Sequence, residues 1–228
     1  MPSPIIKLSS ITNLHDARFG AGMGTVLDMM IGFSLNPNSK NYVSEQDFVQ
    51  ISGWITGCKI VAEIENEKTQ LEINEEVEKI LSNSDYKIDF VQVSSHSDLV
   101  NLKESAHQIP IIFSYQFNQI EEIENSDSLG IMFRKLNEDF KIDYFLLESK
   151  EAALTKLSQL AIETLQKLSK EFSIILGFGI TNENVIDLLS QTELKGIAFT
   201  GQAETEVGMG GYTDFDEISD ILEKVEEL

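Results

Sequence analysis

Short apolar runs alternate along the whole chain with segments whose apolar residues recur at helical spacing. Nearly continuous apolar runs are typical of parallel strands that are buried on both faces. Eight such runs are predicted as strands: Ile5–Leu8, Met29–Leu35, Lys59–Ile64, Phe90–Val93, Ile109–Tyr115, Asp143–Leu147, Ser173–Leu176 and Gly196–Phe199. A further strand is predicted over Leu129–Lys135.

Helices are predicted between the strands. Their ranges are Leu14–Met23, Ser44–Ile55, Ile73–Leu81, Leu99–Lys103, Gln119–Glu124, Glu151–Glu171, Asn182–Leu189 and Phe215–Val225. Asn13 and Ser44 precede the first two helices and are residues that favour the N-cap position. Eight strand–helix pairs in 228 residues predict an α/β fold, a single (β/α)8 TIM barrel spanning residues 1–228. The alternative is a doubly wound open sheet, but no G-x-G-x-x-G motif follows the first strand.

The composition narrows the classes of partner. The chain is 42% hydrophobic, which is enough for a large core, and its formal net charge is -21. Such a charge repels nucleic acid and anionic membranes, because both are bound through lysine and arginine. No apolar run approaches the ~18 residues of a membrane span. We therefore expect a small-molecule ligand, no nucleic acid, no membrane, and a monomer or homodimer.

Cysteine and histidine contents indicate neither disulfides nor metal. Cys58 is the only cysteine, which favours a reducing, cytoplasmic location. The three histidines are scattered and have no spacing typical of a metal site. We therefore expect neither a metal nor another cofactor.

In (β/α)8 barrels the chemistry lies at the carboxyl ends of the strands. Glu63 stands there in an otherwise apolar strand, so it either points into the barrel as an acid/base candidate or meets solvent at the strand end. Gly177 and Gly179 follow the seventh strand. They either expose backbone amides that bind phosphate or only turn the strand into a helix.

Several motifs resemble phosphoribosylanthranilate isomerases of tryptophan biosynthesis. Lys7-Leu8-Ser9-Ser10-Ile11-Thr12-Asn13 is similar to that family's Lys-x-Cys-Gly-Ile-Thr-Asn. Further resemblances occur in order at Asn36–Ser44, Phe90–Val93, Gly177–Val185 and Thr200–Glu204. The resemblance implies a (β/α)8 barrel that converts a phosphorylated aminoaldose to an aminoketose by an Amadori rearrangement.

The resemblance also implies roles for individual residues. Glu148 takes the place of the family's aspartate, the general acid, and Ser9 takes the place of its cysteine, the general base. The implied binding residues are Lys40, Asn41, Gln92, Gly177, Gly179, Thr200 and Gly201, with the glycines on the phosphate.

Four features depart from the family pattern. Ser9 is a far weaker base than a thiolate, Glu148 is one methylene longer than the family's aspartate, and Asn41 stands where the family has arginine. In addition, no glycine-rich loop follows Glu148. Two alternatives therefore remain beside the isomerase. One is an inactive barrel that serves as a binding or regulatory protein. The other is a lyase or epimerase that uses Glu63 and Glu148 as a carboxylate pair.

Overall fold

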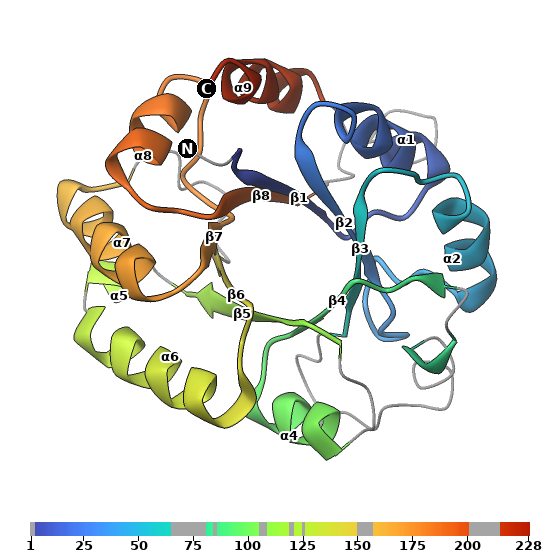
Figure 1. The fold of residues 1–228 in the computed structure, drawn as a ribbon, viewed down its shortest axis with the longest axis horizontal. Coiled ribbons are helices and arrows are strands. Elements are labelled where there is room, and N and C mark those ends of the chain that lie inside the picture. The colour runs from blue at the N-terminus through green and yellow to red at the C-terminus, as the bar shows by residue number, and fades with distance from the viewer. Residues whose placement is uncertain are drawn as a thin grey trace.

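Eight parallel strands close into a barrel in sequence order, with helices around the outside (Figure 1). The structure is a computed structural model that describes residues 3–64, 81–83, 86–104, 109–118, 121–124, 126–149, 157–200 and 215–228. The strands are β1 (Ile5–Ser9), β2 (Asp28–Ser34), β3 (Lys59–Glu63), β4 (Phe90–Val93), β5 (Ile111–Phe117), β6 (Tyr144–Ser149), β7 (Ile174–Leu176) and β8 (Gly196–Thr200). The pairing of β1 with β8 closes the ring and places Ser9 beside Thr200. The predicted (β/α)8 barrel is confirmed, and the open sheet is excluded.

The helices are α1 (Leu14–Met23), α2 (Glu45–Ser52), α4 (His96–Glu104), α5 (Glu121–Glu124), α6 (Ser126–Phe140), α7 (Gln159–Glu171), α8 (Val185–Gln191) and α9 (Asp216–Glu226). Asn13 and Ser44 cap α1 and α2 as predicted, since each side chain accepts a hydrogen bond from the backbone N–H three residues later. The predicted helix Ile73–Leu81 lies outside the described residues except for its last position.

Two of the sequence predictions are wrong. Leu129–Lys135 is not a strand but part of α6, because Leu129, Phe133 and Leu136 recur at helical spacing and are buried together. The long helix predicted from Glu151 begins only at Gln159, where Ser158 accepts a hydrogen bond from the N–H of Ala161. Residues 150–156 lie outside the described part of the chain.

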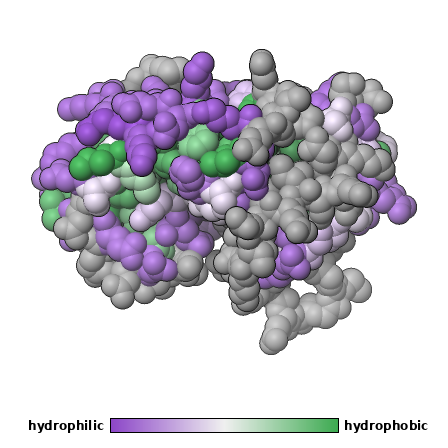
Figure 2. Space-filling model, turned by 90° about the horizontal axis from the view of Figure 1, so that it is seen from below, coloured by the Kyte–Doolittle hydropathy of each residue, from purple (hydrophilic) through white to green (hydrophobic). Residues whose placement is uncertain are grey.

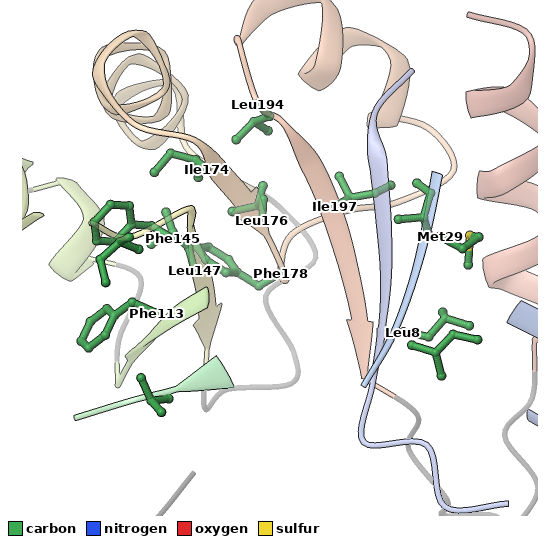
Figure 3. Close-up of a cluster of buried hydrophobic side chains, with 14 of the residues drawn as sticks. Leu8, Met29, Phe113, Phe145, Leu147, Ile174, Leu176, Phe178, Leu194 and Ile197 are labelled. Atoms are coloured by element: carbon green, nitrogen blue, oxygen red, sulfur yellow. The ribbon is translucent and has the colours of Figure 1, made fainter. Parts of the chain in front are cut away.

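The core has two layers because successive side chains of a strand point to opposite faces. The outward side chains of the strands pack against the helices, as Leu8, Phe145, Leu176 and Ile197 do in Figure 3. The inward layer takes one apolar residue from every strand: Ile5, Met30, Val61, Phe90, Ile112, Leu146, Ile175 and Ala198. This inner cluster fills the barrel interior, so any ligand site must lie beyond it, toward the carboxyl ends of the strands.

The surface is largely polar, in keeping with the charge of the chain. The side of the molecule below α4 and α6 in Figure 1 is mainly hydrophilic and is crossed by a band of hydrophobic residues (Figure 2). Ile131 on α6 is the most exposed of the large hydrophobic side chains in the described residues. None of the helices in the described segments is both long enough and apolar enough to cross a membrane.

Candidate functional site

A polar layer lies directly above the inner apolar cluster. Two residues beyond each member of that cluster, the same strand again points inward. These positions are Lys7, Gly32, Glu63, Gln92, Ser114, Glu148, Gly177 and Thr200. Every one of them is polar, charged or glycine. The strands therefore change from apolar to polar within one inward step, and this change marks the mouth of the barrel as the candidate site.

Lys7 is the centre of this layer. Its Nζ donates hydrogen bonds to Oγ of Ser9 at 2.6 Å and to Oε1 of Glu63 at 2.5 Å. The three side chains are almost fully enclosed, with exposed fractions of 0% for Lys7, 3% for Ser9 and 4% for Glu63. A buried ammonium and a buried carboxylate require such pairing, because neither charge retains its hydration.

The second oxygen of Glu63 is held by the turn after β1. Ser10 donates to Oε2 of Glu63 from its backbone N–H and from its hydroxyl, each at 3.0 Å. Ser10 has a φ of 57°, in the left-handed region, and this conformation aims both donors at the carboxylate. Glu63 therefore points into the barrel, and the alternative in which it meets solvent is wrong. Its use in acid/base chemistry stays a prediction.

Glu148 enters the same layer from β6. Its Oε2 accepts a 2.6 Å hydrogen bond from the hydroxyl of Ser114 on β5, and the residue as a whole is half-buried. Withdrawal from solvent raises the pKa of Glu148. The positive charge of Lys7 and the hydrogen bond from Ser114 act in the opposite direction, whereas the negative charge of Glu63 adds to the increase. The net effect on the pKa of Glu148 is an increase, because withdrawal from solvent is the largest of these causes.

Gly177 gives Glu148 its room. A β-carbon at position 177 would lie 3.3 Å from Cγ of Glu148 and 3.2 Å from the carbonyl oxygen of Leu147. Both distances are tighter than ordinary van der Waals contact. The glycine at the end of β7 is therefore explained by packing. Its own N–H donates to the carbonyl of Leu147 at 2.8 Å, so this N–H is not open to an anion.

The β7–α8 loop is held in shape by Asn184. Its Oδ1 accepts a 2.8 Å hydrogen bond from the N–H of Thr181, and its Nδ2 donates to the carbonyl of Gly179 at 2.8 Å. Gly179 has a φ of 66°, which a glycine adopts at little cost. Helix α8 begins after Asn184, at Val185, so the predicted start at Asn182 is three residues early.

The remaining predicted binding residues lie around the rim. Gln92 is buried and sits beside Glu63 in the β3–β4 register. Thr200 is exposed at the end of β8, whereas Gly201 lies outside the described residues. Lys40 is exposed and Asn41 partly buried in the loop between β2 and α2. The structure thus brings Glu63, Gln92 and Glu148 into one polar layer, to which Ser9 is joined by its hydrogen bond with Lys7. The roles of the rim residues stay predictions.

The sequence analysis missed Lys7 and Ser114 as members of the site. The signal for Lys7 was present: a lysine in an apolar strand, at even spacing from Ile5 and Ser9, must share their face. Lys7 was instead noted only as part of a motif. Within the described ranges, no three His, Cys, Asp or Glu side chains are placed to hold a metal ion.

Comparison with protein-family models and with curated proteins gives no match. Among solved structures, phosphoribosyl anthranilate isomerase from Thermotoga maritima is similar with a TM-score of 0.68 at 23% identity, over 99% of this chain and 100% of that one. The same enzyme type in complex with reduced 1-(o-carboxyphenylamino)-1-deoxyribulose 5-phosphate gives 0.66 at 23% identity, over 99% and 100%. The tryptophan synthase A-subunit from Pyrococcus furiosus gives 0.63 at 15% identity, over 99% and 97%. At these identities the likeness is one of fold.

Proposed function

We propose that this protein is an isomerase of the phosphoribosylanthranilate isomerase type, which converts a phosphorylated aminoaldose to an aminoketose. Three observations support the proposal. Solved isomerases of this type share the fold over the whole chain. The sequence carries their motifs in order, and one of the neighbouring structures binds a phosphorylated deoxyribulose derivative.

The observation that carries the proposal is the state and position of Glu148. A general acid must hold its proton near neutral pH and must reach the substrate. The pKa of Glu148 is raised by withdrawal from solvent, and the residue lies half-buried in the polar layer at the mouth. Glu148 donates its proton to the furanose ring oxygen, and the ring opens to a Schiff base.

Position 9 then serves the second proton transfer. After ring opening, a base removes the proton from C2 and the electrons move toward the nitrogen, which yields the enol form of the aminoketose. Ser9 lies at the carboxyl end of β1, one inward step beyond Lys7, and its oxygen is hydrogen-bonded to the Lys7 ammonium. The hydroxyl occupies the place of the base, and its weakness predicts slow turnover.

Phosphate is held at the ends of β7 and β8 without a basic side chain. The amides around Gly179 and Gly201 supply the donors, and Asn184 fixes the turn at Gly179. Thr200 adds a hydroxyl at the same edge. Asn41 stands where the family has arginine, with Lys40 beside it, and these two residues bind the anthranilate carboxylate. Gln92, beside Glu63 in the polar layer, contributes a further polar contact.

The proposal is tested by mixing the purified protein with phosphoribosylanthranilate and following the loss of substrate fluorescence. We expect turnover above the buffer rate, and a loss of about 100-fold or more in kcat for Glu148→Gln. Glu163→Gln is the matched control, since it makes the same charge change on the exposed face of α7. A wild-type rate equal to that of buffer removes the isomerase.

A second candidate function is binding without catalysis. One observation favours it: Lys7, Ser9 and Glu63 are almost completely enclosed and satisfy one another's hydrogen bonds. A barrel of this kind still binds the phosphorylated ligand. Calorimetric titration with the product analogue, reduced 1-(o-carboxyphenylamino)-1-deoxyribulose 5-phosphate, separates the two functions. Binding without turnover supports the second candidate. If the protein neither binds the analogue nor turns over the substrate, both candidate functions are wrong.

A further inference from the structure

Lys7 is the one fully enclosed charged group of the described barrel mouth to which the proposed reaction gives no part. Its side chain is 0% exposed, so the ammonium does not contact bulk solvent. Two of its three N–H donors are accounted for by Ser9 and Glu63, at 2.6 and 2.5 Å. A lysine held in this way is a fixed positive charge rather than a flexible side chain.

The direction of the hydrogen bond to Ser9 fixes the orientation of that hydroxyl. An ammonium has no lone pair and only donates. Ser9 Oγ is therefore the acceptor, and its own hydrogen must point away from Lys7. A bond from a charged donor also stabilises negative charge on its acceptor.

The charged groups that face Lys7 come from two other strands. Glu63 on β3 is in direct contact, and Glu148 on β6 is close enough for its charge to be influenced by Lys7. The second oxygen of Glu63 accepts its hydrogen bonds from Ser10. The ammonium, and not a carboxylate, is thus the charge in hydrogen-bond contact with the atom at position 9.

We propose that Lys7 is a positioning residue whose ammonium orients the side chain at position 9 and stabilises negative charge on it. The inference rests on the proposed function only where it says that negative charge at position 9 is used in catalysis. The Lys7 ammonium, held in place by Glu63, offsets the effect of burial and makes the side chain at position 9 more acidic.

A thiol introduced at position 9 reports this effect directly. Ser9→Cys places a titratable atom beside Lys7, and an opposite charge at this distance lowers a pKa by about 1–3 units. The measurement is the rate of alkylation by iodoacetamide as a function of pH. Every variant also carries Cys58→Ala, so that the introduced thiol is the only one that reacts.

The comparison is between Ser9→Cys and Ser9→Cys/Lys7→Met. We expect the midpoint of the alkylation profile to rise by about 1–3 pH units when Lys7 is removed. Equal midpoints overturn the proposal. Lys59→Met in the Ser9→Cys background is the matched control, because Lys59 also forms an ion pair from a strand, with Asp28 at 3.0 Å, but is 39% exposed at the far end of β3. This control leaves the midpoint unchanged.

Removal of Lys7 leaves Glu63 buried without its cation, so folding is checked by circular dichroism. Glu63→Gln is added to the Lys7→Met variant to neutralise both members of the pair. If neither variant folds, the alkylation midpoint of the Ser9→Cys variant alone tests the proposal. A midpoint below ~8.5, the ordinary value for a thiol, supports the proposal, and a midpoint at or above it overturns the proposal.

The failure of this inference is distinguishable from failure of the proposed function. A midpoint that depends on Lys7, in a protein without isomerase activity, keeps the positioning role and removes the isomerase. Isomerase activity with a midpoint indifferent to Lys7 does the reverse.

Discussion

Gly32 on β2 lies directly against the Glu63 carboxylate on β3. A β-carbon at position 32 would overlap Oε1 of Glu63 and would lie 3.1 Å from Nζ of Lys7. A glycine is therefore required at this position by tertiary packing, because it leaves the space in which the ion pair of Lys7 and Glu63 forms. Any larger residue at this position must displace one of the two charges.

Gly32→Ala is expected to destabilise the protein by about 2–4 kcal/mol, because overpacking and disruption of a buried ion pair combine. Urea denaturation measures the free energy of unfolding. Gly22→Ala is the control, since a β-carbon there meets no atom within 4 Å. A glycine-to-alanine change within a helix stabilises by about 0.5–1 kcal/mol. Equal effects of the two substitutions contradict the packing role of Gly32.

The raised pKa of Glu148 makes the contribution of this residue to the free energy of unfolding fall as the pH rises. Its folded pKa is raised, so the folded state binds the proton more tightly than the unfolded chain, whose glutamate titrates near ~4.3. The contribution of Glu148 to stability is therefore complete below pH ~4.3 and is lost as the pH rises through the folded pKa.

Glu148→Gln removes this ionisation and is expected to be more stable than the wild type at pH 8. The advantage shrinks toward pH 4. Urea denaturation of both proteins at several pH values measures the difference, and Glu163→Gln corrects for the change in net charge. A difference that stays constant from pH 4 to pH 8 rules out the raised pKa.

Asn184 is expected to support both the fold and anion binding at the β7–α8 loop. Asn184→Ala removes the hydrogen bonds to Thr181 and Gly179, at a cost of about 1–3 kcal/mol. Asn184→Asp keeps the acceptor for the N–H of Thr181 and is expected to recover part of the loss. Stabilisation by inorganic phosphate, followed by thermal unfolding, is expected to weaken in the alanine variant. If phosphate stabilises both proteins equally, this loop does not form the anion site.

Cys58 is expected to be inert in the folded protein. Its thiol donates to the carbonyl of Gly20 at 3.5 Å, and burial together with the charge of Asp28 raises its pKa to about 11. Reaction with a disulfide reagent at pH 8 is therefore expected to be about 100-fold slower than in urea, because little thiolate is present. Asp28→Asn removes the smaller of the two causes and is expected to accelerate the native reaction. Equal rates in the native and unfolded protein contradict the burial of the thiol.

The architecture was readable from the pattern of apolar runs. Eight strands and their order follow from local sequence, because a strand buried on both faces must be apolar almost throughout. Capping by Asn13 and Ser44 was equally local, since a cap involves only residues within one turn. The pattern failed at Leu129–Lys135, where a short apolar run has the same composition in a strand and in an amphipathic helix.

Part of the candidate site was likewise predictable from local sequence, and part was not. The sequence by itself placed Ser9, Glu63 and Glu148 at strand ends, because the end of an apolar run is a local feature. Only the closed barrel decided that Lys7 of β1 reaches Glu63 of β3, and that Gly32 between them is required for the contact. These contacts join strands that are tens of residues apart, and their distances depend on barrel closure and strand register, which no local pattern specifies.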